Sequence, residues 1–552
     1  MAVALKVNEH SLIQNLRFAF SKGTTYLSEL LQNARRAGAS KIELTIDWQA
    51  GQVDVVDDGA GISDLQKVLS IAESGWGPEI METETPYGMG FLSCLFAASH
   101  VTIVSKAQRI AFYTRDALDF SDIPVETLEL PEQASWTLVQ LNGVKNIPDV
   151  EGIKHMVAGF PIPVFLNGVE LPRPHSIEGR GFLKTEVGLV SMPMNPYGSC
   201  AVYLQGLPVR IGMHDPVWAS QRNVVHLDTT RFMGRIPDRD SVVDPNVAKE
   251  AVRSVLRQLW VEKMTRIGKQ AITKDVAFQR GVLRDKGAEF LGFKELRPLL
   301  NQFVVLPPQI IFGAFILFAR DRAAGEMEVS SFTKSDVEFG VEGAVLVDSD
   351  LDFSDDDNND NEMAIKALLR HQKIQLIDTT QLDSEHWVFP HLLSHPEKVQ
   401  WTASQLSESV RVQMVYFNKL SVSLCDSITV SADFRVGNNQ TRNMTAEIDD
   451  YPLYQSSVGL LVPAKSNGCD GARQAFSYLD EGDDLDESAM EKDDEVITRH
   501  IQALRHPDPA KLLQTILQSD VALNEYAQLA GHRFEVSIQK NGQLDYVHVI
   551  TG

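Results

Sequence analysis

The chain has 552 residues, more than one hydrophobic core usually supports, so we expect about two to four domains of roughly 100–200 residues each. Hydrophobic residues make up 43% of the chain and charged residues 23%, which excludes a largely disordered or fibrous protein. The 51 basic and 74 acidic residues give a net charge of −23, which disfavours broad binding to DNA through its phosphates.

Membrane and secreted proteins are also disfavoured. No stretch approaches the roughly 20 apolar residues that a membrane-spanning helix requires, and the N-terminal residues have neither the basic nor the apolar region of a signal peptide. The four cysteines are far apart and form no CxxC pair, so we expect neither a disulfide framework nor a zinc site. We therefore expect a cytoplasmic protein that does not bind membranes.

The first predicted elements are a helix and two strands. Apolar residues recur at helical spacing from Thr24 to Ala37, and Gly38 is suited to end that helix. Apolar and polar residues alternate in Lys41–Asp47, and Gln52–Asp58 has the composition of a second strand. The turn-forming residues between these segments predict a hairpin.

The next predicted elements are two helices separated by a loop. The first helix is predicted from Ser63 to about Ser74, and the polar residues 75–87 are expected to form a loop. The second helix is predicted from Leu92 to Ala98. Further strands are predicted near His100–Lys106, Arg109–Arg115 and Ser135–Asn142.

The pattern of strands and helices predicts three α+β parts. The first part is residues 1–150, and the second, residues 151–270, closes with a long helix from Asn246 to about Gly268. Residues 271–552 contain strand-like and helical segments whose role the sequence does not reveal. This third part carries two acidic runs, which we interpret as solvated linkers or loops: residues 348–362 and 480–495.

Glu29 and Asn33 are the first candidate site residues. They are four residues apart on the predicted helix, so both side chains project from one face. A carboxylate there could accept a proton from an attacking water, while the amide oxygen could ligate magnesium, which prefers oxygen ligands. Taken alone, such a pair occurs by chance in many helices.

A second candidate motif, Asp57-Asp58-Gly59-Ala60-Gly61, ends the second predicted strand. Glycines in such a turn let the backbone adopt positive φ angles and approach a ligand closely. A carboxylate there could accept a hydrogen bond from an exocyclic amine such as that of adenine. Taken alone, the segment also fits an ordinary acidic turn.

A third candidate motif, Tyr87-Gly88-Met89-Gly90-Phe91, precedes the helix that begins at Leu92. The N-terminus of a helix offers free amides and a favourable dipole to phosphate, so this segment suits a triphosphate. Glycine pairs before helices are common, and the segment does not match the P-loop pattern of GxxxxGK followed by Ser or Thr. A P-loop protein is therefore unsupported.

In this order, the three motifs resemble the ATP site of one superfamily. It unites DNA gyrase, the ninety-kilodalton heat-shock chaperone, histidine kinases and the MutL mismatch-repair proteins, and its pattern is ExxxN, DxGxG and a glycine loop that opens a helix. The segments IAESGWG, YGMGFLS and HVTIVSK are similar to the chaperone, whereas QNARRAGASKIEL is similar to MutL. The resemblance concerns residues 1–150.

The resemblance implies a Bergerat-type α/β sandwich for residues 1–150, in which helices back a mixed sheet. A middle or transducer-like α+β domain and a further α+β C-terminal region would follow, and residues 75–87 would form a lid over ATP and Mg²⁺. Glu29 would be the base that activates water, Asn33 the magnesium ligand and Asp57 the acceptor for adenine. Further contacts to ATP would come from Gly59, Gly61, Ser74, Gly88, Met89, Gly90 and Phe91.

The sequence departs from this family at two places. Arg36 stands where the family commonly has an acidic residue, so the electrostatics beside Asn33 should differ. The expected lid is short and contains Glu79, Glu82 and Glu84, which we interpret as residues that keep an exposed loop soluble.

An arginine of the second part is also expected at the site. In several relatives the second domain sends a lysine or arginine to the γ-phosphate, where it stabilises developing charge. The candidates here are Arg235 and Arg239, which precede the long predicted helix. A surface salt bridge is the alternative role for both.

Together, these features predict Mg²⁺-dependent ATP binding and hydrolysis that drive lid closure, a clamp-like cycle and formation of a homodimer. The alternative is a nucleotide-gated scaffold that binds a partner protein and hydrolyses little ATP. A chaperone-like role with a protein client, a DNA-processing role and an accessory role in phage defence all stay open. The acidity of the chain disfavours DNA.

Overall fold

The chain divides into two compact units, Met1–Lys263 and Met264–Gly552. The computed structural model describes residues 4, 8–18, 20, 23–71, 76, 84, 88–129, 135–178, 181–213, 222–235, 239–313, 331–341, 344–348, 359–414, 419–437, 440–455, 457–466, 487–506, 508, 510, 513–514 and 531–550. Across these described residues, no helix has both the length and the apolar character needed to cross a membrane.

The first unit is built on an eight-stranded mixed sheet in the order β5-β4-β3-β6-β2-β1-β7-β8. Its pairs are antiparallel except for β1 and β7, which run parallel. This sheet continues beyond residue 150 and includes two short strands after it. The strands are β1 (Ile42–Asp47), β2 (Gln52–Asp57), β3 (His100–Ser105), β4 (Gln108–Tyr113), β5 (Glu126–Thr127), β6 (Thr137–Asn142), β7 (Val164–Leu166) and β8 (Val169–Glu170).

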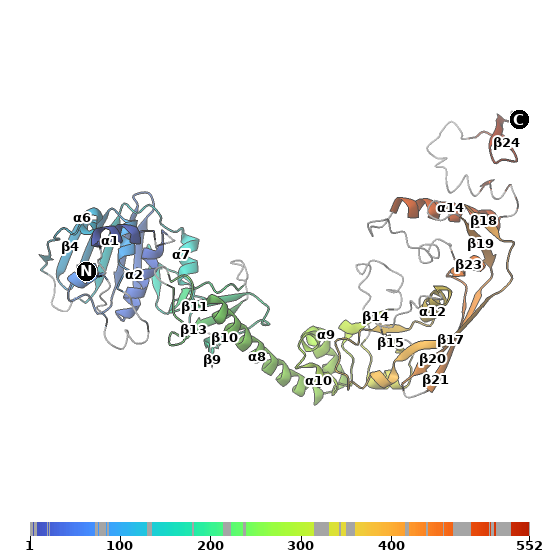
Figure 1. Ribbon diagram of the computed structural model, residues 1–552, viewed down its shortest axis with the longest axis horizontal. Helices are drawn as coiled ribbons and strands as arrows, with labels where there is room; N and C mark the ends of the chain where they lie inside the picture. Colours follow the sequence, from blue (N-terminus) through green and yellow to red (C-terminus); the bar gives the residue numbers. More distant parts are fainter. Residues whose placement is uncertain are drawn as a thin grey trace. The chain divides into compact units, whose positions relative to one another are not determined.

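Helices back this sheet, so the predicted sandwich of helices and a mixed sheet is confirmed (Figure 1). The central helix is α2, and the buried Leu27 and Leu31 fix it to the core. Gly38, with a φ of 71°, follows its end and donates its N–H to the carbonyl of Arg35. The helices are α1 (Glu9–Leu16), α2 (Thr25–Arg36), α3 (Gln66–Leu69), α5 (Leu92–Ala97), α6 (Thr114–Leu118) and α7 (Val150–Val157).

The helix predicted from Ser63 to about Ser74 is shorter than expected in the described residues. Helix α3 spans Gln66–Leu69, and Ser70 takes up an extended backbone with a ψ of 116°. The hydroxyl of Ser70 donates a hydrogen bond back to the carbonyl of Gln66. A serine that bonds to the backbone in this way competes with the helix, and the sequence periodicity did not reveal it.

A second, five-stranded sheet follows in the first unit, in the order β12-β11-β13-β10-β9. The central pair, β11 and β13, is parallel and fully buried. The long helix α8 (Pro245–Ile272) confirms the helix predicted from Asn246 to about Gly268. Its N-terminal part packs on this sheet through Val252 and Leu256. The strands are β9 (Leu183–Thr185), β10 (Gly188–Ser191), β11 (Cys200–Leu204), β12 (Leu207–Pro208) and β13 (Asn223–Leu227).

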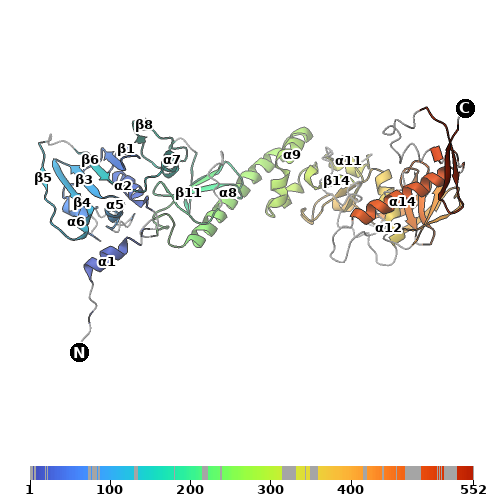
Figure 2. The same cartoon turned by 90° about the horizontal axis from the view of Figure 1, so that it is seen from above.

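The second unit contains two mixed sheets and a separate hairpin, which confirms a further α+β region. The first sheet has the order β14-β16-β15-β17-β20-β21, with α12 packed on it, and the second has the order β18-β19-β23-β22. Figure 2 shows α14 alongside the strands of this unit.

The second unit begins with helices and becomes rich in strands toward its C-terminal part. Its helices are α9 (Val276–Gly292), α10 (Arg297–Leu300), η1 (Pro308–Ile310), α11 (Lys334–Glu338), α12 (Asn359–His371), η3 (Phe389–His391) and α14 (Glu487–Arg505). Its strands are β14 (Ile311–Gly313), β15 (Leu346–Asp348), β16 (Gln375–Ile377), β17 (Leu393–Ala403), β18 (Val410–Val412), β19 (Leu420–Cys425), β20 (Ile428–Val436), β21 (Gln440–Ile448), β22 (Leu453–Gln455), β23 (Gly459–Pro463), β24 (Phe534–Ile538) and β25 (Leu544–Val549).

The interpretation of both acidic runs as linkers or loops needs correction. Residues 487–495 of the second run belong to helix α14, which packs on its sheet through Ile497 and Ile501. Apolar residues four apart can fix an acidic helix to a sheet, so local charge did not decide the structure here. In the first run, Asp348 ends β15 and residues 359–362 begin α12, while residues 349–358 lie outside the described residues.

Candidate functional site

The three sequence motifs meet at one cavity in the first unit. Its volume is about 440 Å³, within the range of roughly 300–1,000 Å³ that is usual for small-molecule sites. Helix α2, the turn after β2 and the glycine segment before α5 form much of its wall. The predicted site residues that line it are Glu29, Asn33, Asp57, Gly61, Gly88, Met89, Gly90, Phe91 and Arg239.

Glu29 and Asn33 lie one turn apart on α2 and both line the cavity, as their spacing predicts. Glu29 is only 5% exposed. The backbone of Gly90 approaches it so closely that a Cβ atom at Gly90 would overlap the Glu29 carboxylate. The glycine segment therefore needs glycine at this position to close against the acid.

Asp57 is the last residue of β2 and is buried in the wall of the cavity. Its Oδ1 accepts a hydrogen bond of 3.0 Å from the N–H of Gly59. Burial raises the pKa of the Asp57 carboxyl, although the Gly59 hydrogen bond opposes the shift. The apolar side chains of Val55, Ile103 and Val139 line the same cavity, so it suits a flat apolar ring with a polar edge.

The glycines of the second and third motifs occupy different positions. Gly59 lies outside the cavity wall, where a Cβ atom would overlap Ala37, and its N–H orients Asp57. Gly61 and Gly88 line the cavity with φ angles of 72° and 64°, which favour glycine. Ser93 of α5 donates its hydroxyl to the carbonyl of Gly90 at 2.5 Å and so fixes the glycine segment to the helix.

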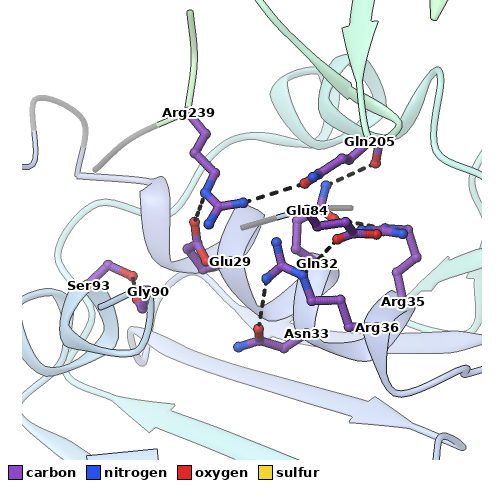
Figure 3. Close-up of polar contacts among 10 residues, drawn as sticks. All are labelled: Glu29, Gln32, Asn33, Arg35, Arg36, Glu84, Gly90, Ser93, Gln205 and Arg239. Atoms are coloured by element: carbon purple, nitrogen blue, oxygen red, sulfur yellow. Dashed lines mark hydrogen bonds and ion pairs between the residues drawn. The ribbon is translucent and has the colours of Figure 1, made fainter. Parts of the chain in front are cut away.

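The two arginines predicted from the second part are placed differently. Arg239 lines the cavity, and its Nε lies 3.6 Å from Oε1 of Glu29 (Figure 3). Its φ is 52°, and such a backbone in a residue other than glycine costs free energy and is often found at functional sites. Arg235 is exposed and lies outside the cavity wall, and its backbone N–H donates to Ser241 at 2.8 Å.

A second set of charged contacts in the site joins two arginines at the C-terminal end of α2 to Glu84. Oε2 of Glu84 accepts hydrogen bonds from Nη2 of Arg35 at 2.5 Å and from Nε of Arg36 at 2.9 Å. Burial opposes ionisation of Glu84, but the two arginines outweigh it and keep its pKa below the usual value. The interpretation of Glu84 as a solubilising residue is therefore wrong, because its side chain is only 13% exposed and binds two arginines.

Few residues of the expected lid are described. Trp76 lines the cavity and Glu84 contacts α2, so these two residues of the segment lie at the site. The predicted ATP contact Ser74 and the lid residues Glu79 and Glu82 lie outside the described residues.

Sequence reasoning missed the part of the cavity wall that comes from β6. Thr137 and Val139 line the cavity, and Thr137 Oγ1 lies 3.1 Å from the hydroxyl of Ser105. Ser105 in turn accepts the N–H of Ile62, at 2.8 Å, in the turn after β2. The strand itself was predicted from the sequence, but the pairing of β6 with β2, which brings Thr137 and Val139 to the motifs, was not readable.

Comparison with known proteins agrees with this geometry. Residues 22–142 match a family model described as "Histidine kinase-, DNA gyrase B-, and HSP90-like ATPase". The match includes Glu29, Asn33 and Asp57 but ends before Arg239. No curated protein matches the chain in sequence.

Proposed function

Because residues 22–142 match the model of the histidine kinase-, DNA gyrase B- and HSP90-like ATPase family, we propose that the protein binds ATP in the cavity beside α2 and hydrolyses it. One observation carries this proposal. An acid, an amide, a buried carboxylate and a glycine segment, which are separate in sequence, line one cavity of about 440 Å³.

The Asp57 end of the cavity is proposed to bind adenine. Oδ1 of Asp57 accepts the N–H of Gly59, and the carboxylate has further lone pairs that can accept the exocyclic amine. The apolar side chains of Ile103 and Val139 provide contacts for the faces of the ring. This arrangement fixes the orientation of the base, because one polar edge is bound within apolar surroundings.

The Glu29 end of the cavity is proposed to carry the hydrolytic step. Glu29 accepts the proton of the water that attacks the terminal phosphorus, and the leaving group is ADP. Arg239, whose Nε is 3.6 Å from Glu29 Oε1, stabilises the charge that develops on the transferred phosphoryl group. The backbone of Gly90 brings the glycine segment against the same acid and helps to exclude bulk water.

Magnesium fits the amide oxygen of Asn33. Arg36 Nη1 approaches Asn33 Oδ1 at 3.5 Å, the outer limit of a hydrogen bond, so this oxygen stays available to a hard cation. When bound, magnesium would neutralise part of the phosphate charge. Asn33 would hold the ion and orient the phosphates relative to Glu29.

Hydrolysis is proposed to drive a clamp-like change between the two sheets of the first unit. Arg239 follows the second sheet, and the carbonyl of Gln205, in the turn between β11 and β12, accepts a hydrogen bond of 2.9 Å from Gln32 of α2. When a phosphate binds Arg239, it competes with Glu29 for this arginine. The nucleotide state therefore changes the contacts that join α2 to the second sheet.

The test is Mg²⁺-dependent ATP binding by calorimetry together with phosphate release. We expect Asp57→Asn to weaken binding about a hundredfold, because a charge-assisted hydrogen bond to the base is lost. Glu29→Ala should bind ATP normally but lose about 10²–10⁴-fold in turnover. Asp54→Asn, on the same strand but outside the cavity wall, is the matched control. Tight binding by Asp57→Asn, or normal turnover by Glu29→Ala, would contradict the proposal.

The same assay separates the two arginines. Arg239→Ala should slow phosphate release about 10²-fold or more, because it removes a charge that stabilises the transition state. Arg235→Ala, which removes an exposed arginine from the same segment, is the control and should turn over normally. Equal effects of the two substitutions would contradict a role for Arg239 at the phosphate.

A further inference from the structure

Arg36 is a buried charge whose hydrogen bonding is incomplete among the described residues. Its side chain is only 2% exposed, and it lines the cavity. Its Nε donates to Glu84 and its Nη1 reaches Asn33 at 3.5 Å, but in the described part of the chain Nη2 is a buried donor with no hydrogen-bond partner. Such donors are costly and uncommon, so this atom calls for an acceptor that binds in the cavity.

Two positive charges converge beside Glu29. The guanidinium groups of Arg36 and Arg239 both point toward this acid (Figure 3). Arg36 comes from α2 and Arg239 from the segment after the second sheet, so the fold brings them together from distant parts of the chain. Burial and the neighbouring Arg239 lower the pKa of Arg36, while Glu29 and Glu84 oppose this shift. An anion bound between the two guanidinium groups would relieve their repulsion.

The chemistry of Arg36 selects phosphate as that anion. A guanidinium group presents several N–H donors in a plane, a geometry that matches the oxygens of phosphate. Arg36 lies one turn from Asn33 and faces Glu29, so it belongs to the part of the cavity where the terminal phosphorus must lie. Arg35, its neighbour, contacts Glu84 but does not belong to the cavity wall.

We propose that Arg36 binds the terminal phosphate of ATP through Nη2 and is a residue that distinguishes ATP from ADP. This inference rests on the proposed function of the cavity. It adds a phosphate-binding residue on α2 itself, within the helix that carries Glu29 and Asn33. Because this positive charge is part of the protein, preference for ATP over ADP persists when magnesium is removed.

The experiment compares ATP and ADP binding by calorimetry for the full chain in Mg²⁺ and in EDTA. In Arg36→Gln, ATP affinity should fall about tenfold or more, while ADP affinity changes much less, because only ATP loses a charge-assisted hydrogen bond. Arg35→Gln removes the same charge from the neighbouring residue and is the matched control, which should keep the ratio of the wild type. Thermal unfolding checks that each variant is folded.

The outcomes separate this inference from the proposed function. If the wild type binds neither nucleotide, both fail. If Asp57→Asn abolishes ATP binding but Arg36→Gln leaves the ratio of ATP to ADP affinity unchanged, only the role of Arg36 is overturned. If Arg36→Gln does not fold, Arg239→Ala in EDTA decides, because Arg36 is then the arginine left in the described part of the cavity wall: equal affinities for ATP and ADP overturn the inference and a retained preference supports it.

Discussion

Two buried polar clusters of the first unit differ in how completely their polar groups are paired. The cavity cluster comprises Glu29, Arg36, Glu84 and Arg239, and one of its buried donors has no partner among the described residues. The histidine–tyrosine cluster lies by the second sheet and comprises His175, Tyr203 and His226. Both clusters join segments that are distant in sequence, but they have different consequences for the molecule.

The histidine–tyrosine cluster is fully engaged in packing and hydrogen bonding. Nδ1 of His175 lies 2.6 Å from the hydroxyl of Tyr203, and Nε2 of His226 lies 2.8 Å from the carbonyl of His175. The rings of Tyr203 and His226 stack with their centroids 5.1 Å apart. Burial lowers the pKa of His226, so its imidazole is neutral at neutral pH. A cluster whose polar groups are paired in this way stabilises the fold.

Incomplete pairing beside a cavity distinguishes ligand-binding polar groups from structural ones. In the cavity cluster, two guanidinium groups face one acid, and a buried donor that adjoins the cavity has no partner within the described part of the chain. An arrangement of this kind costs free energy until a ligand completes it. Substitutions in the cavity cluster should therefore change binding more than stability, and substitutions in the histidine–tyrosine cluster should do the reverse.

Tyr203→Ala should give the largest effect on stability. It removes a side chain that is 2% exposed, so the free energy of unfolding should fall by about 3–5 kcal/mol. Tyr113→Ala, at a tyrosine that is 55% exposed, is the matched control and should change stability by less than about 1 kcal/mol. The measurements are denaturant unfolding and, at a temperature where both variants are folded, ATP affinity. A large loss of affinity without a loss of stability would contradict the structural role of the histidine–tyrosine cluster.

The sequence could predict one of these clusters only in part, and the other not at all. Of the cavity cluster, Glu29 was recognised from its spacing to Asn33 on one helix, and Arg239 was one of two arginines named from the resemblance. His175 is 28 residues from Tyr203 and 51 residues from His226, and only strand pairing brings these residues together. Local spacing carries no signal for contacts of that range.

The same limit applied to the charges of the site. Arg36 was recognised as a departure from the family pattern, but its bond to Glu84 spans 48 residues and was not predicted. The mixed sheet was predicted and residues 163–171 were expected to form strands, but the pairing that joins β7 and β8 to this sheet was not predicted. Pairing over long distances is what the sequence alone did not reveal.

Glu84→Gln should give an intermediate effect on the stability of the nucleotide-free protein. The substitution leaves Arg36 and Arg35 near one another without their shared carboxylate, so nucleotide-free protein should lose about 1–3 kcal/mol of stability. ATP should recover part of this loss, because its phosphate offers Arg36 a new partner. Thermal unfolding with and without ATP measures both effects.

Glu126→Gln is the control for Glu84→Gln, because Glu126 also binds an arginine, Arg109, at 2.6 Å but is 57% exposed. Exposed ion pairs contribute little, so this variant should lose less than about 1 kcal/mol, with no recovery that depends on ATP. Equal losses in the two variants would mean that the cavity cluster behaves as a surface salt bridge.

The smallest expected effect is a pH dependence of binding at the Asp57 end of the cavity. Burial raises the pKa of Asp57 in the folded protein, so the carboxyl takes up a proton at a higher pH than an exposed aspartate. The proton stabilises the nucleotide-free folded state, whereas the exocyclic amine of adenine binds the ionised carboxylate best. Affinity should therefore fall as the pH falls through this raised pKa.

Adenosine is the suitable probe for this titration, since it lacks phosphates that would titrate over the same range and avoids the arginines at the other end of the cavity. Its affinity should fall a few-fold as the pH is lowered from neutrality through the raised pKa of Asp57, measured by calorimetry or ligand-observed NMR. Asp57→Asn should bind adenosine weakly, with no such pH dependence, because the titrating group is gone. An unchanged affinity across this range in the wild type would mean that the protonated acid accepts the amine equally well, which would contradict the proposed role of the Asp57 charge in binding adenine.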